Sequence, residues 1–277
     1  MSIRLKFVKE YKKFCDKYPG FRKLSRKFMY SLFAYLVRAT HWKFMNYGYD
    51  EPAGTWMHPS LNEDDEDNRY SIQLYHHLAV NVSLDKKKVL EVGCGRGGGA
   101  SYLGRYFNPY KIVGLDYCGK AISFCKKNYK ENNLSFVRGD AESLPFDDHS
   151  FDLVFNVESS HCYGSFTRFV QQVARVLNPG GYFLITDFRE PEKIEGFIDS
   201  LKDSGLNLIS NRDISDNVLS ALDSHNEKKL MIISKNVPPW LRGLMREFAG
   251  VQGSNLYKKF RSDKMKYLSI VLQKQPV

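Results

Sequence analysis

The segment Lys88-Val-Leu-Glu-Val-Gly-Cys-Gly-Arg-Gly-Gly-Gly-Ala100 decides the fold. It predicts a short apolar strand at Val89–Val92, a glycine-rich turn, and a helix over Ala100–Phe107. Glycines in such a turn let a ligand approach the backbone closely, and the helix N-terminus that follows favours an anionic group. The segment therefore predicts a nucleotide-like cofactor, although the glycine spacing alone does not say which one.

Outward from this segment, short apolar runs alternate with helical patterns. The alternation of strand and helix is typical of a parallel, doubly wound sheet. A final strand is expected at Tyr267–Leu272, after a stretch of helices that ends near Phe248. The other expected strands are Ile112–Leu115, Ser135–Val137, Leu153–Val157, Tyr182–Thr186 and a possible one at Asn207–Ser210; the other expected helices are Asn68–Val82, Lys120–Asn132, Phe166–Leu177 and one after Ile194.

Three carboxylates follow one another at the ends of successive predicted strands. Glu91 lies inside the first strand, where its charge suits a cationic ligand and would repel a pyrophosphate. Asp116 ends the second strand and is placed to bind ribose hydroxyls, and Asp140 follows the third strand, beside an expected adenine amino group. A single acid of this kind is often only a helix cap or a surface ion pair, but the ordered set favours S-adenosylmethionine over NAD.

The motifs Val-Leu-Glu-Val-Gly-Cys-Gly, Gly-Asp-Ala-Glu-Ser-Leu-Pro-Phe, Phe-Asp-Leu-Val-Phe-Asn and Arg-Val-Leu-Asn-Pro-Gly-Gly resemble those of the class I S-adenosylmethionine-dependent methyltransferases, over about residues 88–190. The resemblance implies a Rossmann-like α/β fold with seven strands, the last one antiparallel. It also implies that Glu91, Gly93 and Gly95 surround the methionine part, that Asp116 binds the ribose, and that Asp140 and Ala141 lie beside the adenine. The further candidates for cofactor contact are Cys94, which is expected to be a small buried side chain of the loop, Tyr117, Asn156 and Val157.

A narrower resemblance runs from about residue 42 to the C-terminus. The segments Asn68-Arg, Leu74-Tyr-His76, Gly97-Gly-Gly-Ala-Ser-Tyr-Leu103, Asn156-Val-Glu-Ser-Ser-His-Cys-Tyr163 and Phe248-Ala-Gly-Val-Gln-Gly253 are similar to the phthiotriol and phenolphthiotriol dimycocerosate methyltransferases. Those are mycobacterial O-methyltransferases of long, lipid-like polyketides. The resemblance implies a lipophilic hydroxyl acceptor. The first 40 residues are more basic than that family pattern, so the substrate is not fixed.

His161 and Asp187 are the candidate catalytic pair. O-methylation of an alcohol benefits from a general base, because the hydroxyl pKa lies far above 7. His161 follows the fourth strand, at the rim where the methyl group should point, and Asp187 ends the fifth strand and could orient its imidazole. Sugar and natural-product O-methyltransferases of this fold carry a similar pair. The alternative is that His161 is a structural rim histidine and that Asp187 caps a helix or touches the cofactor.

Tyr75 and Glu158, together with His161, are the candidate substrate residues. Tyr75 lies on the predicted helix upstream of the glycine loop, and Glu158 follows the fourth strand directly. No metal site is expected, because Asp187 lacks the additional carboxylates or amides that a magnesium-dependent methyltransferase would show.

Positive charge is concentrated at the start of the chain. Of the 41 Lys and Arg residues, 12 lie in residues 1–48, together with two acidic residues. The net charge of this segment is therefore +10, equal to that of the whole chain. Residues 1–40 are therefore a candidate peripheral membrane contact or an amphipathic helix docked on the core. Nucleic acid is not expected as a partner, because the charge does not surround the site. Scattered, unpaired cysteines favour a cytoplasmic, reducing location, with membrane association through residues 1–40 as the open alternative.

These observations together predict an S-adenosylmethionine-dependent methyltransferase that O-methylates a hydroxyl of a lipophilic small molecule. Residues 1–83 are expected to form a basic helical arm and cap, and residues 84–277 the cofactor-binding domain. A helical insertion at about 214–260, before the last strand, is expected to cover the substrate. The alternatives are an N- or C-methyltransferase of another small molecule, or a cyclase that retains the methyltransferase fold. The sequence does not fix the oligomeric state.

Overall fold

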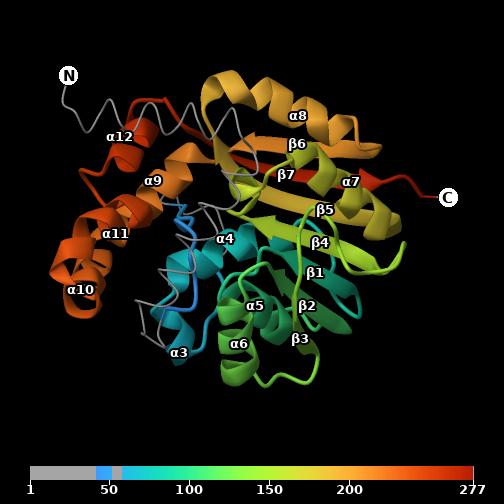
Figure 1. Ribbon diagram of the computed structural model, residues 1–277, viewed down its shortest axis with the longest axis horizontal. Helices are drawn as coiled ribbons and strands as arrows, with labels where there is room; N and C mark the ends of the chain where they lie inside the picture. The colour runs from blue at the N-terminus through green and yellow to red at the C-terminus, as the bar shows by residue number, and fades with distance from the viewer. Residues whose placement is uncertain (1–41, 52–57, 277) are drawn as a thin grey trace.

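The computed structural model describes residues 42–51 and 58–276 and centres on one seven-stranded sheet. The strand order is β3-β2-β1-β4-β5-β7-β6, in which β7 is antiparallel to both β5 and β6 and the other pairs are parallel (Figure 1). The strands are β1 (Lys88–Val92), β2 (Lys111–Asp116), β3 (Leu134–Arg138), β4 (Phe151–Val157), β5 (Leu177–Arg189), β6 (Leu206–Asp213) and β7 (Lys266–Lys274). The seven-stranded, mostly parallel sheet with an antiparallel last strand is confirmed.

Helices cover both faces of this sheet because its strands are apolar on both sides. Along β4, Leu153 and Phe155 pack into one core, whereas Val154, between them, packs into the other. Side chains that alternate in this way belong to a strand buried on both faces. The first core receives α4 (Arg69–Ala79), α5 (Gly98–Tyr106) and α6 (Gly119–Asn128), and the second receives α7 (Phe166–Val176) and α8 (Ile194–Lys202).

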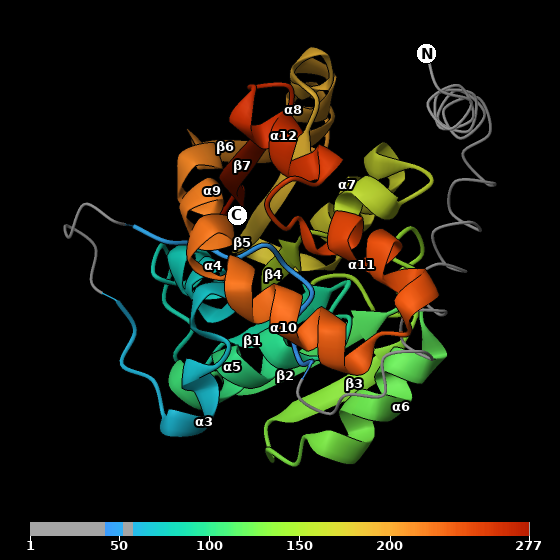
Figure 2. The same ribbon diagram turned by 90° about the vertical axis from the view of Figure 1, so that its left-hand side faces the viewer.

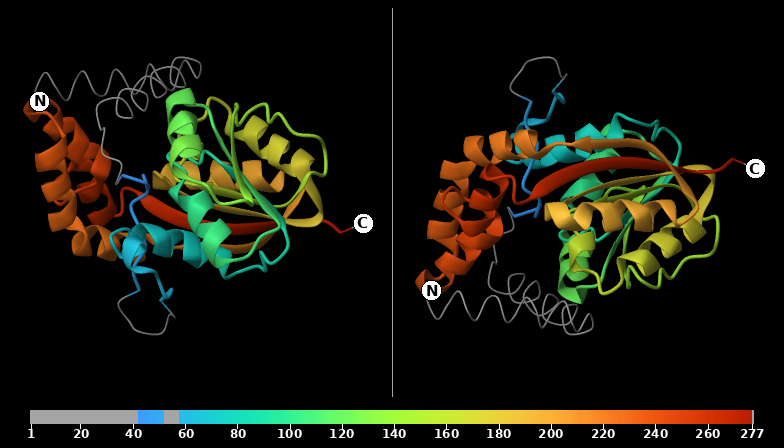
Figure 3. Two further views of the ribbon diagram at one scale, coloured as in Figure 1. Left: turned by 90° about the horizontal axis from the view of Figure 1, so that it is seen from below. Right: turned by 90° about the horizontal axis from the view of Figure 1, so that it is seen from above.

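The predicted insertion before the last strand contains four helices, α9 (Ser215–Ser224), α10 (Asn226–Asn236), α11 (Arg242–Ala249) and α12 (Asn255–Arg261). The sequence led us to expect two helical stretches to about Phe248. The short breaks at His225 and Pro238-Pro239 divide the segment more finely than hydrophobic periodicity suggested. Figure 3 shows these helices gathered at the end of the sheet opposite the C-terminus, which is the end where the parallel strands finish. Ligands bind at this end in doubly wound folds.

Residues 42–51, which we name the strap, have no regular secondary structure and pass between the sheet domain and the insertion (Figure 2). Backbone hydrogen bonds fix the strap to both sides. The Tyr49 amide donates to the carbonyl of Tyr70 in α4 at 3.0 Å, and the Asp50 amide donates to that of Asn217 in α9 at 3.1 Å. A partly buried segment without secondary structure satisfies its polar backbone in this way.

The arm predicted for residues 1–40 lies outside the described residues, so its helical cap and its membrane contact remain predictions. A domain boundary at residue 83 also remains a prediction. Strap residue Phe44 and helix residue Ile72 pack in the same core as the sheet residue Val89. Within residues 42–51 and 58–276, no helix is long and apolar enough to cross a bilayer.

Candidate active site

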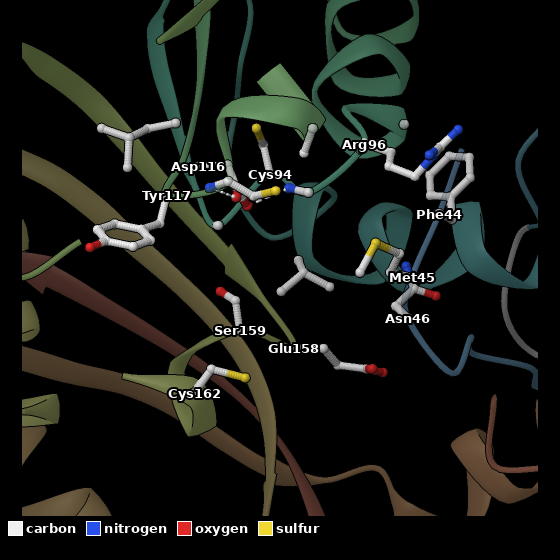
Figure 4. A pocket seen from close by; sticks show the side chains of 18 of the residues that line it. Phe44, Met45, Asn46, Cys94, Arg96, Asp116, Tyr117, Glu158, Ser159 and Cys162 are labelled. Carbon is white, nitrogen blue, oxygen red and sulfur yellow. Dashed lines mark hydrogen bonds between the residues drawn. The ribbon is translucent and has the colours of Figure 1, made fainter. Parts of the chain in front are cut away.

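The glycine loop between β1 and α5 forms one wall of a cavity at the carboxyl end of the sheet (Figure 4). We name it the first cavity. Gly93, Gly95 and Gly97 have φ angles of 78°, 53° and 79°, in the left-handed region that favours glycine. The loop therefore turns sharply enough to leave room above α5. Its lining includes Gly93, Cys94, Gly95, Asp116, Tyr117, Asp140, Ala141, Val157 and Tyr75 from the sequence predictions.

Glu91 lies beneath this loop and is fully buried. Its Oε1 accepts a hydrogen bond of 2.6 Å from the hydroxyl of Tyr75. Its Oε2 has no hydrogen-bond partner in the described structure, although the nearby amide of Ala100 favours the charged form. Burial raises the pKa of Glu91 to about 7. A buried carboxylate oxygen of this kind leaves room for one more hydrogen-bond donor or for a cation.

Asp116, at the end of β2, is fixed by two backbone amides. Gly95 N donates to its Oδ2 at 2.9 Å and Cys118 N to its Oδ1 at 2.7 Å. Burial raises the pKa of Asp116 to about 6, although the two amide hydrogen bonds act against this shift. The carboxylate is therefore held rigidly at the cavity wall, where it can accept hydrogen bonds from a diol.

Asp140 and Asn156, two of the predicted cofactor residues, form hydrogen bonds within the protein. Asp140 Oδ1 accepts a hydrogen bond of 3.0 Å from the amide of Glu142, and the side chain still lines the first cavity. Asn156 does not line it. Its amide nitrogen donates to the carbonyl of Val92 at 2.9 Å and to the hydroxyl of Tyr163 at 3.0 Å. The side chain of Asn156 points from β4 towards β1 and supports the wall, and its contact with the cofactor remains a prediction.

The strap closes the first cavity opposite Asp116 and Tyr117. Figure 4 shows Met45 and Asn46 of the strap across the cavity from this pair. Glu158, just after β4, fastens the strap: its Oε1 accepts hydrogen bonds from Tyr47 N at 2.7 Å and from the hydroxyl of Tyr267 in β7 at 2.5 Å. The strap was not predicted, because no periodic pattern in residues 42–51 marks a cavity wall.

Glu158 has an unusual backbone as well as a buried side chain. Its φ angle of 46° lies in the left-handed region, where a residue with a Cβ is strained. Burial raises the pKa of Glu158 to about 7. A carboxylate held in a strained conformation at a cavity wall suggests a functional constraint at this position.

His161 and Asp187 lie in direct contact beside the first cavity. His161, on the 3-10 turn η1 (Ser160–Cys162), has its Nδ1 2.8 Å from Oδ1 of the fully buried Asp187. The His161 amide also donates to Asp187 Oδ2 at 2.9 Å. The imidazole ring packs against the ring of Phe188, with centroids 4.4 Å apart, and its side chain is 14% exposed. Neither residue lines the first cavity itself.

Two residues that the sequence reasoning missed complete this cluster. Ser160 Oγ donates to Asp187 Oδ2 at 2.5 Å, and the Arg189 guanidinium lies 3.2 Å from the same oxygen. Arg189 could have been found from the sequence, because it is two positions after Asp187 on one strand, so both side chains point to the same face.

The buried ion pair shifts the pKa of both of its members. Burial alone would lower the pKa of His161, but the neighbouring Cys162 and Asp187 raise it to about 9. For Asp187, burial acts to raise the pKa, but His161 and Arg189 outweigh it and hold the pKa far below its ordinary value. The imidazole is therefore cationic at neutral pH in the protein without ligands, and Asp187 is anionic.

Comparisons with known proteins agree with this geometry. Residues 90–185 match the family described as "Methyltransferase domain". The chain is 44% identical over 224 residues to the phthiotriol/phenolphthiotriol dimycocerosates methyltransferase of Mycobacterium tuberculosis, covering 81% of this chain and 82% of that protein. It is 42% identical over 226 residues to a fatty-acid O-methyltransferase of Mycolicibacterium smegmatis, covering 81% and 80%.

The chain belongs to the S-adenosylmethionine-dependent methyltransferases.

Solved structures share the fold of this methyltransferase at low sequence identity. The cyclase SpnF has a TM-score of 0.67 at 20% identity and is covered over 94% of its length, with 90% of this chain aligned. A geranyl diphosphate C-methyltransferase of Streptomyces coelicolor A3(2), solved with S-adenosyl-L-homocysteine, has a TM-score of 0.63 at 14% identity, covering 88% of this chain and 98% of that one. These similarities establish the Rossmann-like class I fold and do not choose between the reactions.

The first cavity fits S-adenosyl-L-methionine, the cofactor of this family. Glu91 does not line this cavity, but its buried carboxylate lies beneath the glycine loop, where its negative charge would favour a cationic ligand such as this cofactor. Asp116, a fixed carboxylate at the cavity wall, remains the candidate for the ribose hydroxyls, and Ala141 beside Asp140 the candidate for the flat base. The described residues contain no group of His, Cys, Asp and Glu that could hold a metal ion.

Proposed function

We propose that this methyltransferase transfers a methyl group to a hydroxyl oxygen of a lipophilic small molecule. The observation that carries the proposal is the contact of 2.8 Å between His161 and the buried Asp187, next to the cavity that fits the cofactor. Supporting it are the names of two relatives, which describe methyl transfer to a phthiotriol lipid and to a fatty acid.

S-adenosylmethionine supplies the methyl group on a cationic sulfur. The hydroxyl oxygen of the acceptor attacks the methyl carbon as the bond from that carbon to sulfur breaks. Because Nδ1 of His161 donates its hydrogen to Asp187, Nε2 is the nitrogen that can accept the hydroxyl proton. His161 is thus the proposed base, and Asp187 holds its ring and stabilises the cation that forms. Such a base contributes about 10²–10⁴-fold to the rate.

The raised pKa of His161 fits this role once the cofactor is bound. The positive charge of the sulfonium disfavours a second cation nearby and therefore lowers the pKa of the imidazole. The imidazole of His161 is then neutral, and can accept a proton, when the cofactor is bound. Tyr75 and Glu158, which line the first cavity, are the proposed contacts near the reacting centre. Tyr75 acts through Glu91, which its hydroxyl binds.

The proposal is tested by incubating the full chain with cofactor that carries a deuterated methyl group and a panel of long-chain alcohols. We expect a methyl ether whose mass carries the label, together with one S-adenosylhomocysteine for each turnover. His161→Ala should lower kcat by about 10²-fold or more. His149→Asn is the matched control, because this histidine is exposed, lies before β4 at the other end of that strand, and has a φ angle of 56° that asparagine tolerates.

The outcomes separate the alternatives. Label transfer to added amines or carbon nucleophiles of similar chain length, with no methyl ether from the alcohols, indicates another acceptor atom. Product formation without release of S-adenosylhomocysteine indicates a cyclase that keeps the cofactor as structure, a reaction that the fold shared with SpnF permits. Either result would contradict the proposed hydroxyl chemistry.

A further inference from the structure

A second cavity of about 310 Å³ lies between the strap and the helical insertion. Its lining is dominated by apolar side chains of α10 and α11 and of the turn between them, Met231, Ile232, Ile233, Val237, Met245 and Phe248. Ligand pockets of roughly 300–1,000 Å³ with mostly apolar walls and a few polar groups are the usual sites for small lipophilic molecules. The second cavity has this size and composition.

The second cavity adjoins the first along the strap. Met45 and Asn46 line both cavities. Tyr47 lines the second one, while its amide is bound to Glu158, which lines the first. The ring of Tyr47 packs on Phe188 with centroids 5.6 Å apart, and Phe188 packs on His161. The inner end of the second cavity therefore lies two aromatic contacts from the proposed catalytic pair.

Lys229 provides a polar group at this inner end. Its Nζ lies 5.9 Å from the centre of the Tyr47 ring and donates a hydrogen bond of 3.2 Å to the carbonyl of Ala249. An ammonium group has three donors, and Lys229 forms no salt bridge with any carboxylate of residues 42–51 or 58–276. Burial lowers its pKa to about 8. Its neighbour Lys228 differs, because Asp67 pairs with it at 2.6 Å.

We propose that the second cavity binds the apolar chain of a single-chain lipid, and that Lys229 donates hydrogen bonds to the oxygen at its polar end. The inference depends on the proposed function only in identifying this lipid with the methyl acceptor. Binding itself requires neither the cofactor nor turnover. Lys229 then sets which end of the lipid faces His161, and the cavity selects for chain length.

The test is calorimetric titration of the cofactor-free full chain with octanoate and dodecanoate at neutral pH. Each methylene that leaves water for an apolar cavity strengthens binding by roughly fourfold. We expect dodecanoate to bind at least about tenfold more tightly than octanoate. Equal affinity for the two chains, or no binding of either, would overturn the proposal.

Two variants on neighbouring helices locate the chain. Met231→Asp places a charge at the wall of the second cavity and should weaken dodecanoate binding by about tenfold or more. Leu244→Asp is the matched control, because Leu244 is 44% exposed, as Met231 is 49% exposed, but does not line the cavity. An equal effect of both substitutions would contradict the assigned site. Unchanged affinity for S-adenosylmethionine shows that each variant is folded.

A second pair of variants tests the polar end. Lys229→Met keeps an unbranched apolar side chain and removes the ammonium, so dodecanoate binding should weaken by about tenfold while its advantage over octanoate remains. Lys228→Met should change the affinity by less than about twofold, because Asp67 already pairs with that lysine. Indistinguishable effects of the two substitutions would refute the role of Lys229.

The lipid-binding proposal and the proposed function can each be contradicted without the other. If dodecanoate binds as expected but no lipid alcohol or acid is methylated, the second cavity stands and the proposed function is wrong. If a lipophilic hydroxyl is methylated with no dependence on chain length or on Met231, the proposed function stands and the second cavity is not the site of the chain.

Discussion

The substitution Asp187→Asn should move the titration of His161 to lower pH. The pKa of His161 is about 9, compared with an ordinary value of 6.5, and Asp187 is its hydrogen-bonded anionic partner. This difference corresponds to about 3 kcal/mol of preference for the charged imidazole. With asparagine, the contribution of Asp187 is lost while that of Cys162 remains, and burial of the ring still favours the neutral form. We expect the pKa of His161 to fall below 9.

Two measurements follow this change. Nuclear magnetic resonance of the imidazole protons, with His161→Ala to assign the signal, gives the pKa in the cofactor-free protein. The pH dependence of kcat gives it in the complex, where the rate should rise tenfold per pH unit until the imidazole is neutral. In the unsubstituted protein at pH 7, only about 1% of His161 is neutral without cofactor. Because the sulfonium favours the neutral ring, the inflection in kcat should lie below 9.

Stability should report the same ion pair. The pKa of His161 is higher in the folded chain than in the unfolded chain, so its contribution to the free energy of unfolding is fully present below about pH 6.5 and is lost as the pH rises through about 9. Chemical denaturation across this range should show the loss in the unsubstituted protein and not in Asp187→Asn. A His161 signal that titrates at the same pH in both proteins would refute the reasoning.

Three further predictions concern the first cavity. Gly99→Ala should weaken S-adenosylmethionine binding and lower the free energy of unfolding, because the new Cβ would lie 2.0 Å from Cζ of Tyr75. The control is Gly196→Ala in α8, which has open space around it and should raise the free energy of unfolding by about 0.5–1 kcal/mol. Thermal unfolding measures both changes. Glu158→Gly should be less destabilised than Glu158→Ala by about 1 kcal/mol, because only glycine relieves the φ angle of 46°; equal unfolding free energies would exclude this strain. S-adenosylmethionine affinity, measured by calorimetry, should rise as the pH increases from 6 to 8, because Glu91 has a pKa of about 7 and its ionised form favours a cationic ligand. Glu91→Gln should flatten this pH dependence. A flat profile in the unsubstituted protein would contradict the role of Glu91.

The sheet and the cofactor loop were readable from the sequence because short-range patterns determine them. Val89 and Leu90 enter opposite cores, as the period of two along a strand requires, and the glycines of the loop occupy positive φ angles that few other residues adopt. The contact between His161 and Asp187 was predictable for a related reason. His161 follows β4 and Asp187 lies near the end of β5, and these neighbouring parallel strands end at the same edge of the sheet.

The strap and the second cavity could not be predicted from the sequence, because contacts between residues far apart in the chain create them. Tyr47 and Glu158 are 111 residues apart in the chain, and no periodicity links them. The orientation of the Asn156 side chain shows the same limit. A motif gives the position of a residue on a strand, but neighbours such as Val92 and Tyr163 decide where its amide points.

The strap also links the occupancy of the two cavities. Residues 42 and 44–46 form part of the lining of both, so a ligand that shifts these residues on one side changes the shape of the site on the other. Such coupling is reciprocal: if the cofactor tightens lipid binding by some factor, the lipid tightens cofactor binding by the same factor. The strap, which Glu158 holds in place, thus allows cofactor and lipid to strengthen each other's binding without a separate regulatory site.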